Sequence, residues 1–264
     1  MALRSALWTV MTGAAQKAAR ALKRDFGEVE QLQVSRKGPS DFVSAADLKA
    51  EKVLREELTK ARPRFGFLME EGGEIKGEDG HHRWIIDPID GTTNFLHGIP
   101  HFAISIGLEM DNEIIAGLVF NPVVDEMFYA EKGKGAFLND RRLRVSARDS
   151  LGDAVLATGI PFQGRPGHAP FLTQLERVMK EVAGVRRAGT ASLDLAYVAA
   201  GRYDGYWEKG LQPWDIAAGI LLVREAGGFI SDFDGRKEEI YKGDLVAANA
   251  KLHKPVLDLL AGKA

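Results

Sequence analysis

The chain has 264 residues, a formal net charge of −2 and no cysteine. Its length is near the upper limit of ~250–300 residues for one hydrophobic core, so one domain or two lobes around a cleft are both allowed. Its 45% hydrophobic and 27% charged residues are typical of a globular protein. The lack of cysteine excludes disulfides, thiolate zinc sites and iron–sulfur clusters. The nearly balanced charge leaves no basic footprint for nucleic acid or anionic lipid.

No segment has the pattern of an export signal or a membrane span. Residues 1–7 lack an apolar block followed by a small-residue cleavage site. No apolar run approaches the ~20 residues that cross a bilayer. We therefore expect a cytoplasmic protein with no membrane partner and no direct contact with nucleic acid.

The first part of the chain has helical spacing. Apolar residues recur at three- and four-residue steps from Leu3 to Leu22, which predicts an amphipathic helix. Lys37–Asp41 contains Gly and Pro and is interpreted as a turn or loop. A second helix is predicted over about Ala45–Lys60, because Ser44 and Asp47 match an N-terminal capping box.

Strand patterns follow in the next eighty residues. Short apolar runs predict strands at 65–69, 84–86 and 127–130. Phe102–Met110 alternates strictly between apolar residues and smaller or polar ones, and Ile114–Phe120 returns after Asp111-Asn112, which predicts a hairpin.

The second half alternates strands with helices. Strands are predicted at 154–158, 203–207 and 245–248, and helices at 171–182, 192–200, 214–226 and 254–260. The pattern predicts an α/β fold of layered sheets and helices. We expect one domain over residues 1–264; if it has two lobes, the charged stretch near 139–150 is their predicted seam.

Acidic residues are concentrated between Glu70 and Asp90, with seven acids against two bases. Asp87 and Asp90 directly follow the apolar run Trp84–Ile86, and α/β sheets bind ligands at the carboxyl ends of their strands. Two close carboxylates in a partly dry site require a cation, and oxygen-only ligands select Mg²⁺. The structural alternative is a pair of acids in Asx-type turn hydrogen bonds.

The residues after these acids favour phosphate chemistry. Gly91–Asn94 predicts the start of a short helix, whose free backbone N–H groups bind phosphate oxygens. Carboxylates for a metal beside donors for an oxyanion are typical of a metal-assisted phosphoryl site. Asp215, near the start of a later helix, is either a first-turn acid that suits the helix dipole or a third carboxylate for the same metal; its spacing leaves both open.

These motifs together resemble the inositol monophosphatase family. The matching residues are Glu70-Glu71, the segment Trp84–Phe95 (WIIDPIDGTTNF), Trp214–Ala218 and Glu225–Gly228, in the expected order and over essentially the whole chain. The resemblance implies a layered α/β/α/β/α sandwich of the sugar-phosphatase type. It also implies Mg²⁺-dependent, typically lithium-sensitive hydrolysis of a phosphate monoester. One departure is Gly72-Gly73 after the glutamate pair, where the family often has Ser or Thr.

The resemblance implies a site for two or three Mg²⁺ ions, with Mn²⁺ as a substitute. Glu70, Asp87 and the backbone carbonyl of Ile89 would hold one ion. Asp87, Asp90 and Asp215 would hold the second, and Glu70 would help to hold a weaker third ion through water.

The resemblance also assigns catalytic and substrate-binding roles. Glu70, Asp47 and Thr92 would be catalytic, with Asp47 and Thr92 bonded to each other and orienting the attacking water. The residues implied to contact the phosphate or the alcohol of the substrate are Gly91, Thr92, Gly189, Thr190, Ala191, Glu208 and Asp215.

The expected activity is hydrolysis of inositol monophosphates to inositol and phosphate by a homodimer, the usual family assembly. The same chemistry on fructose 1,6-bisphosphate, a nucleotide 3′-phosphate or histidinol phosphate is the first alternative. A regulatory protein-binding module on this fold is the second.

Several residues keep a structural interpretation beside the functional one. Asp47 is also the acid of a capping box, and Glu208 is also a charge at the rim of a strand. Asp194 is interpreted as a surface or capping residue rather than a ligand. Asp232–Gly235 is interpreted as a turn, and the adjacent His81 and His82 as solvated or structural.

Overall fold

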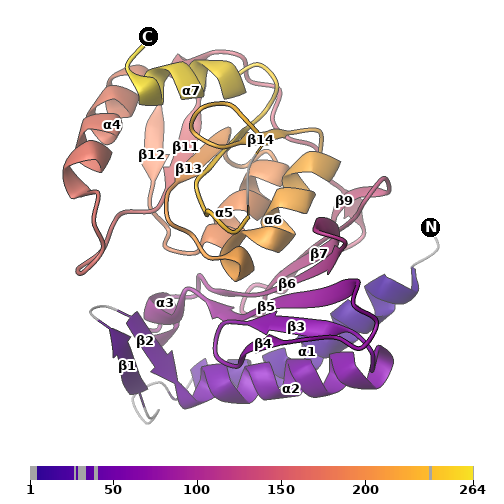
Figure 1. The fold of residues 1–264 in the computed structure, drawn as a ribbon. Helices are drawn as coiled ribbons and strands as arrows, with labels where there is room; N and C mark the ends of the chain where they lie inside the picture. Colours follow the sequence, from indigo (N-terminus) through magenta and orange to yellow (C-terminus); the bar gives the residue numbers. More distant parts are fainter. Residues whose placement is uncertain (1–4, 27, 29–33, 39–40, 238–239, 264) are drawn as a thin grey trace.

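Helices and sheets alternate in five layers in the computed structural model, which describes residues 5–26, 28, 34–38, 41–237 and 240–263 (Figure 1). The outer helices α1 (Ala6–Phe26) and α2 (Ala45–Ala61) cover one face of a first sheet. The helices α5 (Ala191–Ala199) and α6 (Pro213–Glu225) lie between the two sheets, and α4 (His168–Glu181) and α7 (His253–Ala261) cover the far face of the second. The predicted α/β/α/β/α layering is confirmed.

The first sheet has eight strands in the order β10-β9-β8-β7-β6-β5-β3-β4. Their bounds are β3 (Gly66–Met69), β4 (Gly73–Ile75), β5 (His82–Asp90), β6 (Ala103–Met110), β7 (Glu113–Asn121), β8 (Glu126–Glu131), β9 (Gly135–Leu138) and β10 (Arg141–Arg142). The predicted hairpin is β6 and β7, and its turn residues Asp111 and Asn112 have φ angles of 51° and 64°. Asp and Asn tolerate this left-handed backbone better than most residues.

The second sheet has five strands in the order β12-β11-β13-β15-β14. Their bounds are β11 (Val155–Thr158), β12 (Gly184–Arg186), β13 (Gly205–Glu208), β14 (Phe229–Ser231) and β15 (Leu245–Ala248). The chain passes from the first sheet to the second between Arg142 and Val155, a stretch that contains one 3₁₀ turn at Leu151–Asp153. This crossing overlaps the predicted seam.

Period-two alternation along the strands divides the apolar residues among three cores. In β5, Trp84 and Ile86 face α1 and α2, while Ile85 faces α5 and α6. In β13, Tyr206 points into the central layer and Trp207 into the core under α4 and α7. The central layer is therefore apolar on both sides, which requires helices that are buried all round.

Several strands in the structure differ from the predictions made from the sequence. The strands β1 (Val34–Gly38) and β2 (Asp41–Ser44) pair antiparallel at the predicted turn Lys37–Asp41, so Lys37 and Asp41 belong to strands and not to a turn. Pro39 and Ser40 lie outside the described residues. The strands β4, β9, β10, β12 and β14 were not predicted. Each has two to four residues, too few for a readable hydrophobic period.

The strand that carries the acids is longer than predicted. β5 extends through Asp90, and its pairing with β6 becomes irregular between Asp87 and Asp90. Such irregularities often re-aim side chains next to functional sites. In the described part of the chain, no helix is both long and apolar enough to cross a membrane.

Gly117 offers a test of how tightly α6 packs on the first sheet. A Cβ atom at Gly117 would lie 2.8 Å from the carbonyl oxygen of Ala218 and 2.9 Å from its Cα. Because these are backbone atoms, Gly117→Ala should lower the free energy of unfolding by about 1–3 kcal/mol in urea titrations. At Gly13 an added Cβ atom would have no atom of the described residues within 4 Å apart from the backbone of its own helix. Gly13→Ala is therefore the matched control and should be neutral or mildly stabilising. Equal unfolding midpoints for the two variants would contradict this packing.

Candidate active site

The candidate site begins at the end of β5, where Asp87 is 2% and Asp90 8% exposed. The Ile89 N–H donates to Asp87 Oδ1 at 2.9 Å, so the Asx-type bond considered as a structural alternative is present. The Ser192 N–H, at the start of α5, donates to Asp90 Oδ2 at 2.6 Å. The bond from Ser192 joins the end of the first sheet to the central helical layer.

Asp215 is brought to the same place from the far half of the chain. It lies in the first turn of α6, where the Gln212 N–H donates to Asp215 Oδ2 at 2.8 Å. Burial, together with the charges of Asp90 and Glu208, raises the pKa of Asp215 to about 8 against the opposing bond from Gln212. Asp215 is therefore both a helix-start acid and a neighbour of the β5 carboxylates, so the two alternatives left open by its spacing are compatible.

Glu70 approaches from the neighbouring strand. β3 runs parallel to β5, and the Glu70 N–H donates to the Ile86 carbonyl at 3.2 Å, so Glu70 lies beside the part of β5 that leads into Asp87. Burial raises the pKa of Asp87 well above its usual value, and the charges of Glu70, Asp90 and Asp215 add to that rise. Burial likewise raises the pKa of Asp90 to about 7, against the opposing bonds from Ser192.

These four carboxylates form an oxygen-only donor set in a buried place. Among the described residues, no three acidic or histidine side chains lie close enough together to hold a metal ion as they stand. Burial raises the pKa values of Asp87, Asp90 and Asp215, and the charges of neighbouring carboxylates add to that rise, so the charges of these groups repel one another. A hard divalent cation relieves such repulsion, and carboxylate and carbonyl oxygens are its preferred ligands. The residues present therefore fit Mg²⁺ by their chemistry.

Asp47 and Thr92 lie beside the carboxylates. Asp47 is fully buried at the start of α2, where Ser44 donates to its Oδ2 from the backbone N–H at 2.8 Å and from the hydroxyl at 2.6 Å. The Thr92 hydroxyl lies 3.0 Å from the Ile89 carbonyl and 3.3 Å from Asp47 Oδ1. The capping box and the contact with Thr92 thus use different oxygens of one carboxylate.

Gly91 allows the chain to turn sharply at the end of β5. It precedes the predicted short helix, α3 (Thr92–Leu96), with a φ of 94°. A Cβ atom there would lie 2.5 Å from Thr190 Oγ1. Only glycine meets both constraints, the left-handed backbone and the close approach.

A hydrogen-bond network fixes the segment Gly189–Ala191 next to Gly91. The Asn94 side-chain amide donates to the carbonyls of His101 at 2.7 Å and Ala188 at 2.9 Å. The Thr190 hydroxyl donates to the same His101 carbonyl at 2.9 Å. The structure therefore brings the sequence-predicted residues 189–191 against the β5–α3 turn.

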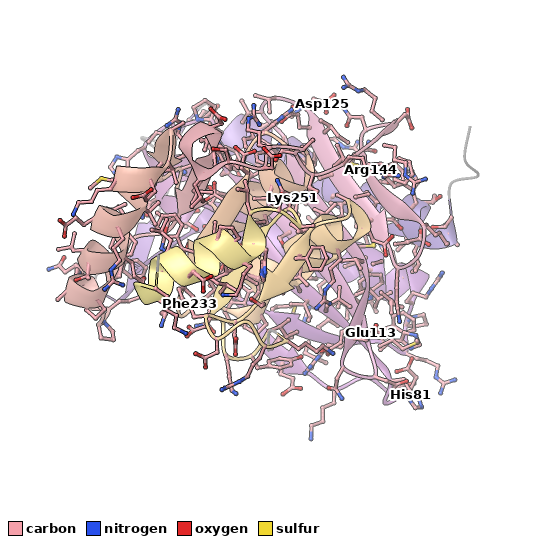
Figure 2. All side chains as sticks on the ribbon, turned by 90° about the horizontal axis from the view of Figure 1, so that it is seen from above. His81, Glu113, Asp125, Arg144, Phe233 and Lys251 are labelled. Atoms are coloured by element: carbon pink, nitrogen blue, oxygen red, sulfur yellow. The ribbon has the colours of Figure 1, made fainter. Side chains whose placement is uncertain are left out.

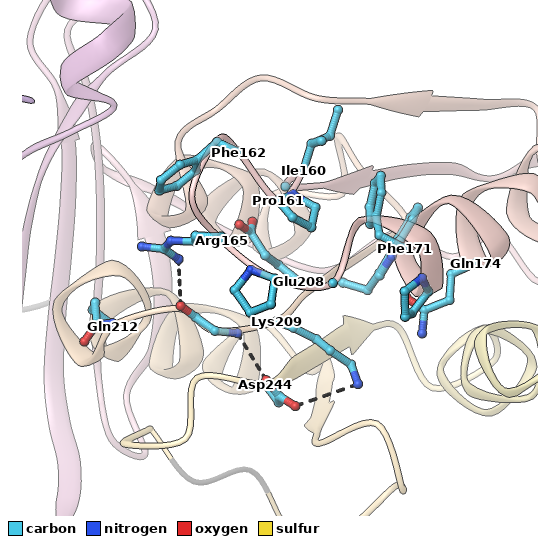
Figure 3. A pocket seen from close by; sticks show the side chains of 16 residues that line it. Ile160, Pro161, Phe162, Arg165, Phe171, Gln174, Glu208, Lys209, Gln212 and Asp244 are labelled. Carbon is cyan, nitrogen blue, oxygen red and sulfur yellow. Dashed lines mark hydrogen bonds and ion pairs between the residues drawn. The ribbon is translucent and has the colours of Figure 1, made fainter. Parts of the chain in front are cut away.

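Glu208 lies between the carboxylates and a separate cavity. Burial raises the pKa of Glu208, the Tyr206 hydroxyl donates to its Oε2 at 2.5 Å, and its charge acts on Asp90 and Asp215. It also lines a cavity of about 660 Å³, shown in Figure 3 with Arg165, Phe162 and Lys209. The Arg165 guanidinium lies over the Phe162 ring at 4.4 Å and donates to the Gly210 carbonyl at 2.9 Å.

Sequence reasoning missed or misread some residues near the site. Asp194 is 1% exposed and its Oδ1 has no hydrogen-bond partner among the described residues, so the surface interpretation is wrong. Burial raises its pKa well above normal, because α5 lies between two sheets. Ser192, Arg165 and Glu51 were not singled out. Their roles depend on contacts with distant segments, for which the sequence carries no local signal.

Two other features are structural, as predicted. His81 lies at the outer edge of the molecule (Figure 2) and contacts Asp111, and His82 contacts Asp79. Asp232–Gly235 is a turn in which Asp232 Oδ1 accepts the N–H groups of Asp234 and Arg236.

Comparison with known proteins agrees with this geometry. A profile of the inositol monophosphatase family matches residues 4–262. The chain belongs to the inositol monophosphatase family. It is 60% identical to the inositol-1-monophosphatase of Rhizobium meliloti over 257 residues, 97% of each chain.

Two relatives of this family carry another name. The chain is 47% identical to the Nus factor SuhB of Pseudomonas aeruginosa over 92% of each chain. The crystal structure of extragenic suppressor protein suhB from Bartonella henselae superposes with a TM-score of 0.95 at 59% identity, covering 97% of this chain and 98% of that one. The family and the fold are thus established together over nearly the whole length.

Removing one buried charge tests the repulsion among the carboxylates. Asp90→Asn keeps an oxygen that accepts the Ser192 N–H but loses the negative charge. We expect its melting temperature in a chelator to equal or exceed that of the parent protein, and the rise on adding Mg²⁺ to be largely lost. Asp111→Asn, at an exposed turn, is the control and should keep the full Mg²⁺-dependent rise. A normal rise for Asp90→Asn, read by scanning fluorimetry, would exclude Asp90 as a metal ligand.

Proposed function

We propose that the protein is a Mg²⁺-dependent phosphomonoesterase that hydrolyses inositol monophosphates to inositol and phosphate. The observation that carries this proposal is the convergence of Glu70, Asp87, Asp90 and Asp215 beside the Asp47–Thr92 pair. The names of the similar relatives, inositol-1-monophosphatases at 60% identity among them, support the same activity.

The metal would be held by these residues as the family resemblance implies. Glu70, Asp87 and the Ile89 carbonyl would hold one ion, Asp87, Asp90 and Asp215 the second, and Glu70 would contribute to a third. When bound, Mg²⁺ lowers the pKa of the attacking water and stabilises the leaving alkoxide. We expect Mn²⁺ to substitute for Mg²⁺ and Li⁺ to inhibit.

The side chains of the protein align the reaction. Thr92 has one hydroxyl proton; donating it towards Asp47 leaves its lone pairs free to accept a hydrogen from the attacking water. Gly91 and Thr92 bind the phosphate oxygens, so that the water oxygen faces phosphorus in line with the ester oxygen. The water oxygen forms a bond to phosphorus as the P–O bond to the alcohol breaks. The attacking water loses a proton to solvent, and the leaving alkoxide takes up a proton from solvent water. No phospho-enzyme is formed, because water itself is the nucleophile.

The alcohol part of the substrate lies towards Glu208 and the segment 189–191. The Glu208 carboxylate accepts hydrogen bonds from hydroxyl groups of a polyol, which favours inositol over less hydroxylated alcohols. Fructose 1,6-bisphosphate, a nucleotide 3′-phosphate and histidinol phosphate remain the alternative substrates for the same chemistry. We also propose a homodimer in the cytoplasm that does not contact nucleic acid directly.

The relatives named Nus factor SuhB favour a second candidate of another class. In that role the chain would act as a regulatory module that binds other proteins. The buried carboxylates favour catalysis as the primary role, because a purely protein-binding surface has no need of them.

A phosphate-release screen tests the proposed activity directly. Inositol 1-phosphate, fructose 1,6-bisphosphate, adenosine 3′,5′-bisphosphate and histidinol phosphate are compared with and without Mg²⁺ and Li⁺. We expect the highest kcat/KM for inositol 1-phosphate, dependent on Mg²⁺ and reduced by Li⁺. Mg²⁺-dependent release from another substrate alone would reassign the alcohol, and no release from any would favour the regulatory role.

Thr92 separates catalysis from metal binding. Thr92→Ala should lower kcat by about 100-fold or more, because it removes the hydroxyl that orients water. The Mg²⁺ concentration for half-maximal activity should change much less. Thr92→Ser keeps the hydroxyl and should recover most of the turnover. Unchanged kcat in Thr92→Ala would remove Thr92 from the mechanism.

A further inference from the structure

The loop that carries Glu70 is short and lies at the edge of the first sheet. β3 and β4 pair antiparallel with Met69 opposite Gly73, so Glu70–Gly72 is the whole connection. β4 is an edge strand whose residues are all exposed. The Glu70 N–H bond to the Ile86 carbonyl attaches the start of the loop to β5, and pairing with the edge strand β4 adds only weak support after it.

Glu51 supports this loop from the other side. It is only 7% exposed, and its Oε2 accepts the Glu71 N–H at 2.8 Å. A buried carboxylate that accepts a backbone N–H makes a charge-assisted hydrogen bond, which is stronger than one between neutral groups. The peptide unit between Glu70 and Glu71 is thereby attached to α2.

Glu51 stands one helical turn after Asp47 on α2. Residues four apart lie on the same helix face, so both buried carboxylates point towards the site. Asp47 contacts Thr92 at the end of β5, and Glu51 contacts the loop at the end of β3. One rigid helix thus contacts the chain segments on both sides of the carboxylate group.

Gly72 leaves the room that Glu51 needs. A Cβ atom at Gly72 would lie 2.9 Å from Glu51 Oε1 and 2.8 Å from Met69 Cε. The φ angle of Gly72 lies outside the left-handed region, so space and not backbone strain makes glycine fit there. A side chain at this position would require the ends of the Met69 and Glu51 side chains to shift.

We propose that Glu51 is a positioning residue that fixes the Glu70 carboxylate for metal binding. We also propose that the missing side chain of Gly72 leaves space for the Glu51 carboxylate. Glu51 acts through the Glu71 N–H and does not touch substrate or metal. The proposal rests on the proposed function in one respect, that Glu70 is a metal ligand.

The first experiment measures the Mg²⁺ requirement in two ways. One is the Mg²⁺ concentration for half-maximal hydrolysis of inositol 1-phosphate, and the other is the Mg²⁺-induced rise in melting temperature, which needs no activity. Glu51→Ala should raise the Mg²⁺ requirement by about 10-fold or more, as loss of a residue supporting a metal ligand does. KM for the substrate at saturating Mg²⁺ should stay nearly constant.

Two further variants separate positioning from general stability. Glu51→Gln keeps an oxygen that accepts the Glu71 N–H and should restore most of the Mg²⁺ affinity. Glu56→Ala removes an exposed glutamate from the same helix and should leave the Mg²⁺ requirement unchanged. If Glu51→Ala does not fold, Glu51→Gln and Gly72→Ala still test the proposal.

A double-mutant cycle tests the part played by Gly72. Gly72→Ala alone should raise the Mg²⁺ requirement, because its Cβ displaces the Glu51 carboxylate. In the Glu51→Ala background the same change should add little, since the crowded carboxylate is gone. Effects of the two substitutions that simply multiply would show that Gly72 does not act through Glu51.

The outcomes distinguish this proposal from the proposed function. An unchanged Mg²⁺ requirement in Glu51→Ala, with a raised one in Glu70→Gln, overturns the positioning role and leaves the phosphatase intact. Absence of Mg²⁺-dependent phosphate release in the parent protein overturns the phosphatase, while the melting-temperature series still reports on the loop.

Discussion

Repulsion between buried carboxylates is the constraint on which this structure depends. Asp87 and Asp90 end one strand, Glu70 follows the next, and Asp215 opens a helix of the central layer. Burial raises the pKa values of Asp87, Asp90 and Asp215, and the charges of neighbouring carboxylates add to that rise. A fold that only needed stability would place apolar side chains here. The arrangement is understandable as a site whose charge is balanced by a divalent cation.

The layered fold holds these charges together by rigid elements. β3 pairs with β5 up to the residue before Asp87, the start of α5 donates a hydrogen bond to Asp90, and α2 supplies Asp47 and Glu51. The glycines of β6 and β7 let α6, and with it Asp215, approach the first sheet closely. Side chains at the ends of strands and helices are positioned more accurately than side chains on long loops. The same packing that stabilises the protein therefore sets the geometry of the site.

The two sides of the site differ in how firmly their side chains are held in place. The side near the carboxylates, with Thr92 and Asp47, consists of buried groups held by several hydrogen bonds. On the other side, Glu208 borders a cavity lined by the loop that carries Phe162 and Arg165. Under the proposed function, the first side would carry the reaction chemistry and the second would select the alcohol. Such a division lets one phosphoryl mechanism serve different alcohols.

The sequence by itself determined the features that depend on residues close together in the chain. The segment Trp84–Phe95 predicted a strand, the acids that end it and the following helix, because these features are neighbours in the sequence. The long helices were also predicted correctly from their hydrophobic period. Only the tertiary structure decided the rest. Asp215 lies near the other carboxylates, Asp194 is buried and Glu51 accepts the Glu71 N–H because the layers bring distant segments together. Short edge strands escaped prediction for the same reason: their pairing is set by a neighbouring strand and not by their own residues.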